Sequence, residues 1–97
     1  MRKVISGITF EWDDEKDKLN IKKHGVAFEI AAQVFFDPYY IEMPDEMHSD
    51  GEPRYNIIGM VNKLLFVVCT DRDESIRIIS ARKADAEERR FYNGNRA

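Results

Sequence analysis

The sequence has few of the residues that disulfide-linked and cofactor-dependent proteins need. Its single cysteine, Cys69, excludes an internal disulfide and any paired-cysteine metal site. Two histidines far apart, His24 and His48, offer few ligands for zinc. The five glycines are scattered and form no phosphate-binding loop. No apolar run approaches the roughly 20 residues that cross a membrane, and residues 1–7 lack the apolar stretch of a signal peptide. We therefore expect no cofactor, no metal, no membrane contact and a cytoplasmic location.

Charge is abundant but unevenly distributed. The chain has 97 residues, which suits one domain over residues 1–97, and its net charge of −3 argues against bulk binding of nucleic acid. However, residues 37–52 contain six acidic and no basic residues, whereas residues 77–97 contain six basic and three acidic ones. A local basic face is therefore possible, although a solvated surface is the plainer interpretation of most individual charges.

Apolar patterns and helix-capping signals predict an α+β domain. Asp13 is suited to begin a helix, and Gly25 is suited to a left-handed residue at its end. The expected elements are a strand at 8–12, helices at 13–24 and 27–36, a short strand at 39–43, strands at 55–61, 64–69 and 76–83, and a helix at 84–93. We expect a small antiparallel sheet with two N-terminal helices and one C-terminal helix.

Two polar features of the predicted helices are unusual. The first helix has a face that is too polar for a core, because Lys16, Asn20 and Lys23 lie on it with Trp12. Either this face is exposed and binds a partner, or its polar groups meet partners across the fold. In the last helix, Glu88 shares a side with an aromatic residue, so it needs a cationic partner from the preceding strand.

Motifs spread over most of the chain resemble those of the BrnT family, the toxin halves of type II toxin–antitoxin modules. The residues that carry the resemblance are Phe10-Glu11-Trp12-Asp13, Lys16, Asn20, Lys23-His24-Gly25-Val26, Phe28-Glu29, Asp37-Pro38, Arg54-Tyr55, Gly59, Arg77 through Ala84, Glu88-Arg89 and Tyr92. The resemblance implies a RelE-like endoribonuclease that inhibits translation. It also implies a BrnA-like ribbon-helix-helix antitoxin as partner, with DNA contacted only through that antitoxin. The RelE-like superfamily varies in its catalytic residues, so the fold supplies no catalytic set.

Cleavage of RNA without a metal needs a base, an acid and cations that stabilise the charge on phosphorus. Histidine titrates near neutral pH, and the arginine fork matches two phosphate oxygens. We predict that these groups converge on one phosphodiester. The candidates are His24, Arg77 and Arg82 as catalytic residues, Lys23, Arg54, Lys83 and Tyr92 as RNA-binding residues, and Glu88 as an orienting carboxylate.

Each candidate also has a plainer structural interpretation. His24 could stabilise the end of its helix through the helix dipole. Arg77 and Arg82 could pair with Glu88, and Tyr92 could pack a helix on the sheet. The alternative for the whole chain is a non-catalytic interaction module that binds an antitoxin or nucleic acid. A DNA-binding module is disfavoured, because no helix-turn-helix signature is present.

Overall fold

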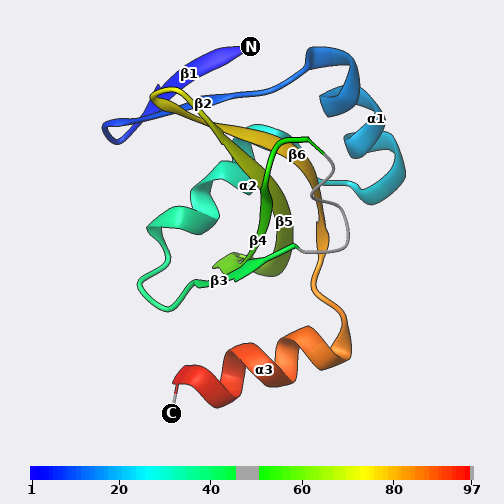
Figure 1. Ribbon diagram of the computed structural model, residues 1–97. Coiled ribbons are helices and arrows are strands. Elements are labelled where there is room, and N and C mark those ends of the chain that lie inside the picture. Colours follow the sequence, from blue (N-terminus) through cyan, green and yellow to red (C-terminus); the bar gives the residue numbers. More distant parts are fainter. Residues whose placement is uncertain (46–50, 97) are drawn as a thin grey trace.

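A six-stranded sheet forms the centre of the computed structural model, which describes residues 1–45 and 51–96 (Figure 1). Its strands are β1 (Arg2–Ile5), β2 (Ile8–Glu11), β3 (Ile41–Pro44), β4 (Arg54–Val61), β5 (Lys63–Arg72) and β6 (Ser75–Lys83), in the spatial order β1-β2-β6-β5-β4-β3. Neighbouring strands are antiparallel except β2 and β6, which are parallel. The expected antiparallel sheet is therefore wrong. The sheet is mixed because β6 pairs with β2 in parallel. The helices α1, α2 and η1 and the strands β3, β4 and β5 lie between these two strands in the sequence.

The expected helix arrangement is also wrong. The helices are α1 (Asp14–His24), α2 (Phe28–Ala31) and α3 (Ala86–Arg96), and α2 continues as the 3₁₀ helix η1 (Ala32–Phe36). Two strands precede α1, and the expected second helix is a four-residue α-helix that tightens into η1. Such tightening is common where a helix ends. Within the residues described, no helix is both long and apolar enough to cross a membrane.

The boundaries of α1 follow from its local sequence, as expected. Asp13 Oδ1 accepts hydrogen bonds from the backbone N–H groups of Glu15 and Lys16, at 2.8 and 3.1 Å. Gly25 has a φ of 72°, and its N–H donates to the carbonyl of Ile21 at 2.8 Å. Both ends of the helix are therefore capped by residues next to it in the sequence.

The two faces of the sheet carry different clusters. The larger core joins one face to α2, η1 and the residues that flank α1, and it includes Phe10, Phe28 and the fully buried Cys69. Burial raises the pKa of the Cys69 thiol. The smaller cluster lies near α3 and contains Ile58 and Tyr92. In Figure 1, α1 and α3 lie toward opposite ends of the molecule.

A bulge in β6 determines which side chains share a face. Cys69 pairs with Ile78, but Val68 pairs with Ser80, so Ile79 has no opposite residue in β5. Because strand side chains alternate, one inserted residue reverses the faces of all residues beyond it. Regular alternation places Arg77 and Arg82 on opposite faces. The bulge instead places both on the face away from α2 and η1.

Candidate nucleic-acid interface

A row of polar side chains crosses the sheet on the face away from α2 and η1. Arg54 of β4 lies opposite Thr70 of β5, and Thr70 lies opposite Arg77 of β6. Arg77 also lies beside Glu11 of β2, and its Nη1 donates to Glu11 Oε2 at 3.2 Å. A cavity of about 160 Å³ at this row is lined by Lys16, Glu52, Arg54, Thr70, Arg72, Arg77 and Ile79. We call this set the arginine cavity. Four of its seven lining residues are cationic.

Two carboxylates orient the guanidinium groups around the arginine cavity. Glu11 accepts a 2.6 Å hydrogen bond from Ser75 Oγ, and this bond, assisted by the charge of Arg77, lowers the pKa of Glu11. Glu52 accepts two bonds from Arg72, at 2.6 and 3.0 Å, which lower the pKa of Glu52 and raise that of Arg72. Both carboxylates are therefore charged at neutral pH and act as fixed acceptors.

Arg82 lies on the same face but makes other contacts. Its Nη1 and Nη2 donate to the two oxygens of Glu88 at 2.8 and 2.9 Å, which raises the pKa of Arg82. Its guanidinium carbon lies 4.2 Å from the centre of the Phe66 ring. The expected pairing of Glu88 with an arginine is therefore confirmed for Arg82, whereas Arg77 pairs with Glu11.

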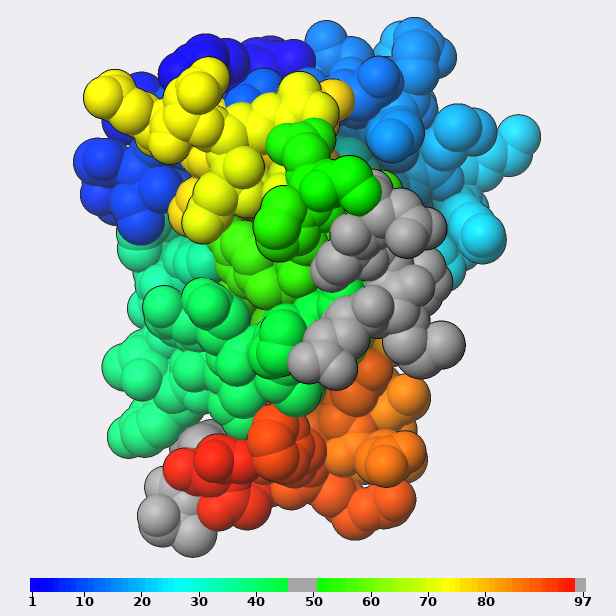
Figure 2. Space-filling view, in the orientation of Figure 1, coloured from blue at the N-terminus to red at the C-terminus, as the bar shows by residue number. Residues whose placement is uncertain are grey.

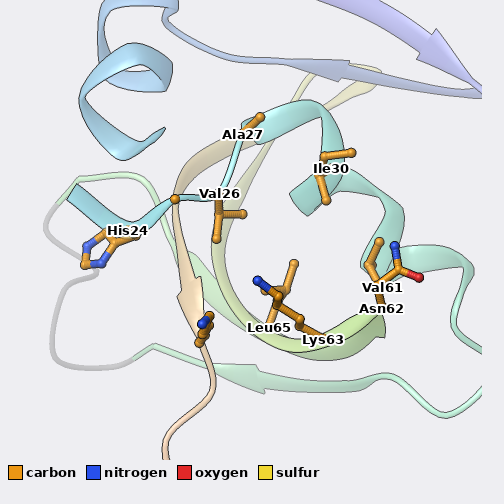
Figure 3. A pocket seen from close by; sticks show the side chains of 10 residues that line it. His24, Val26, Ala27, Ile30, Val61, Asn62, Lys63 and Leu65 are labelled. Atoms are coloured by element: carbon orange, nitrogen blue, oxygen red, sulfur yellow. The ribbon is translucent and has the colours of Figure 1, made fainter. Parts of the chain in front are cut away.

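The three predicted catalytic residues lie in three places. Arg77 and Arg82 lie opposite Thr70 and Phe66, which are four residues apart in β5, roughly 13 Å along the strand. In Figure 2, the segment around residues 70–77, in yellow, lies beside the N-terminal strands, while α3, in orange and red, lies at the other end. His24 ends α1 on the other face of the sheet, at a cavity that it shares with Lys63 and Lys83 (Figure 3). The predicted convergence of His24 with both arginines around one phosphate is therefore not formed.

The predicted RNA-binding residues are also dispersed. Arg54 lines the arginine cavity, Lys83 lies on the His24 side, and Lys23 is exposed in the last turn of α1. Tyr92 is only 1% exposed, and its hydroxyl donates to Asp37 Oδ2 at 2.6 Å. Its ring is not available to stack on a base, and the packing interpretation of Tyr92 holds instead.

Buried polar residues, which the site prediction did not include, hold the framework together. Asp37 accepts hydrogen bonds from the N–H of Tyr39, at 2.9 Å, and of Met60, at 2.8 Å, in addition to Tyr92. Asn20 Nδ2 donates to the carbonyls of Val26 and Ala81, each at 2.8 Å. The polar face of α1 therefore meets partners across the fold at Asn20.

Several members of the arginine cavity were also missed. Lys16 carried a signal in the sequence, because it lies on the polar face of α1 and belongs to a quoted motif, as does the nearby Glu11. Arg72 and Glu52 carried none, because only the strand register places them beside Arg77. His48, the other histidine, lies outside the described residues.

Comparisons with known proteins agree with these features. Residues 12–88 match the family model described as "Ribonuclease toxin, BrnT, of type II toxin-antitoxin system". Among solved structures, the crystal structure of the Brucella abortus ribonuclease toxin BrnT is similar to the chain, with 25% sequence identity and a TM-score of 0.63. The match covers 78% of this chain and 95% of the Brucella chain. No curated protein matches. The chain belongs to the BrnT family of ribonuclease toxins of type II toxin–antitoxin systems.

Proposed function

We propose that the chain is a metal-independent endoribonuclease that inhibits translation in the cytoplasm and cuts RNA at the arginine cavity. The observation that carries this proposal is the convergence of Lys16, Arg54 and Arg77, from three different elements, on one small polar cavity. Family membership supports the ribonuclease activity. The resemblance in sequence supports the wider relationship to RelE-like ribonucleases.

The chemistry follows from the charges. A phosphodiester in the arginine cavity meets planar guanidinium groups that match two phosphate oxygens and remain charged. Glu11 holds Arg77 from the side through its 3.2 Å bond, so the fork has a fixed direction before RNA binds. Cations placed in advance stabilise the extra negative charge that develops on phosphorus in the transition state.

The same face offers a path for the rest of the RNA. Val68 and Ser80 lie between the row of Arg77 and that of Arg82, and both are partly exposed. In the row of Arg82, Glu88 orients the Arg82 guanidinium through hydrogen bonds, and the guanidinium lies over the Phe66 ring. We assign Arg82 to a second phosphate contact on this path, and Glu88 to the orienting role.

The proposed partner is a BrnA-like antitoxin of the ribbon-helix-helix type. The family assignment supports an antitoxin partner, because a type II toxin is paired with an antitoxin. The ribbon-helix-helix type is supported by the resemblance in sequence. In this proposal the pair binds its operator DNA through the antitoxin alone.

The test is cleavage of a short RNA by purified protein in EDTA, with analysis of the new ends. We expect a 2′,3′-cyclic phosphate or a 3′-phosphate. Arg77→Gln should slow cutting by about 100-fold, the order of effect seen when one stabilising donor is removed. Lys22→Gln is the control, because it removes one positive charge from an exposed site on α1. A folded Arg77→Gln protein that cuts at the wild-type rate would refute the assignment.

One observation favours the alternative, a non-catalytic interaction module. The described residues that line the arginine cavity include no histidine or other group that ordinarily titrates near neutral pH. Such a cavity can bind RNA or the antitoxin without cutting. Expression without antitoxin separates the two functions, because growth arrest with intact cellular RNA supports the interaction module and arrest with cut RNA supports the ribonuclease.

A further inference from the structure

A second cationic groove lies at the turn between β4 and β5, at the opposite end of these two strands from Arg54 and Thr70 of the arginine cavity. It consists of two adjoining cavities, of about 360 and 550 Å³, which share Asn62, Lys63 and Lys83. His24 lies at one end of this groove and Arg89 at the other. Figure 3 shows His24 across the first cavity from Asn62. We call this feature the lysine groove.

The lysine groove differs from the arginine cavity in charge compensation. No aspartate or glutamate is among the described residues that line either of its cavities. In the part of the chain that the structure describes, Lys63 and Lys83 make no ion pair and both are exposed. The arginine cavity, in contrast, holds Glu52 bonded to Arg72. The lysine groove therefore offers positive charge without an internal partner, in a chain whose net charge is −3.

The floor of the lysine groove is aliphatic. Val26, Ile30, Val61 and Leu65 line the first cavity, and Ile30 is 44% exposed. No aromatic side chain is among the described lining residues. Single-stranded RNA is commonly held by bases stacked on aromatic rings. An aliphatic floor with a cationic rim instead fits aliphatic side chains flanked by carboxylates, which is the chemistry of an acidic amphipathic peptide.

We propose that the lysine groove is the docking site for an acidic segment of the antitoxin, with aliphatic side chains on the floor and carboxylates at Lys63 and Lys83. This inference rests on the proposed function, because it takes the antitoxin as the partner. It adds that the antitoxin is anchored at the end of β4 and β5 opposite the arginine cavity. Binding of the antitoxin and cutting of RNA then depend on different cations.

The test measures binding of the proposed BrnA-like antitoxin, in purified form, by titration calorimetry at several salt concentrations. The double variant Lys63→Glu/Lys83→Glu should weaken binding by about 10- to 100-fold, because like charges then face each other. Its affinity should also depend less on salt than that of the wild type. Lys22→Glu, an exposed reversal that does not line the groove, should bind as the wild type does. Ile30→Ser should weaken binding even at high salt, because it changes the floor alone.

The outcomes separate the inference from the proposed function. Retention of cutting by the double variant, together with weak antitoxin binding, supports the inference. Wild-type antitoxin binding by the double variant overturns it, and so does a loss of RNA binding with antitoxin binding unchanged, which would make the groove an RNA path. If the wild-type chain cuts RNA but does not bind the antitoxin, the proposed partner and this inference both fail while the ribonuclease remains.

Discussion

Replacing Asn20 with alanine should destabilise the protein strongly, although α1 is mostly exposed. Asn20 is 7% exposed and makes three hydrogen bonds. Its Nδ2 donates to the carbonyls of Val26 and Ala81, and its Oδ1 accepts from the Ala81 N–H at 3.2 Å. Alanine leaves three buried backbone groups without these partners, and each such group costs about 1–3 kcal/mol. Allowing for partial entry of water, we expect a loss of about 3–5 kcal/mol.

Urea denaturation followed by the fluorescence of Trp12 measures this loss. Trp12 is the single tryptophan and is 4% exposed in the core, so its emission reports global unfolding. Asn95→Ala is the matched control, because Asn95 is exposed and water can replace the hydrogen bond that its Nδ2 donates to the Phe91 carbonyl. Asn20→Asp should be nearly as damaging as alanine, because a carboxylate cannot donate to two carbonyls. A loss below 1 kcal/mol for Asn20→Ala would show that these bonds do not hold α1 to β6.

Three further substitutions test other contacts. Tyr92→Phe removes the 2.6 Å hydrogen bond that joins α3 to Asp37 at the end of η1. Urea denaturation should show that the free energy of unfolding falls by about 1–3 kcal/mol, and an unchanged midpoint would contradict this role. Gly59→Ala places a Cβ 2.8 Å from Val34 Cβ, so it should lower the melting temperature through a loss of about 1–3 kcal/mol, and a stabilised variant would show that η1 moves freely. The pKa of Glu11 lies below the ordinary value for a glutamate, chiefly because the Ser75 hydroxyl donates a hydrogen bond to its carboxylate. Its stabilising effect is therefore present above the unfolded pKa and is lost as the pH falls through the folded pKa. The stability difference between wild type and Glu11→Gln should shrink between pH 7 and pH 3, and a difference independent of pH would exclude the linkage.

The elements with local signals could be predicted from the sequence. Asp13 and Gly25 mark the ends of α1 through bonds to residues two to four positions away. By contrast, β1 is a short edge strand with exposed Arg2 and Lys3, and its pattern resembles that of a loop. The parallel pairing of β2 with β6 joins residues more than 60 positions apart, and no local pattern records it.

The candidate site depended on a feature that the sequence does not show. The residue types predicted a functional role for the arginines of β6. Regular alternation of side chains, however, predicts that Arg77 and Arg82 lie on opposite faces of the sheet, and they lie on the same face. The bulge at Ile79 depends on how β6 pairs with β5, and Ile79 itself is an ordinary strand residue. The two ends of α1 reach different cavities, Lys16 the arginine cavity and His24 the lysine groove, and this placement is also a tertiary property.

The measurement that tests the central claim most directly is a map of where RNA binds. A 2′-O-methyl RNA that contains 4-thiouridine cannot be cut by attack of its own 2′-hydroxyl, and it can be photocrosslinked to the protein and located by mass spectrometry. We predict crosslinks in peptides that contain Lys16, Arg54 or Thr70, which surround the arginine cavity. Crosslinks confined to peptides that contain His24 or Lys63 would contradict the account, because the RNA would then lie on the opposite face of the sheet.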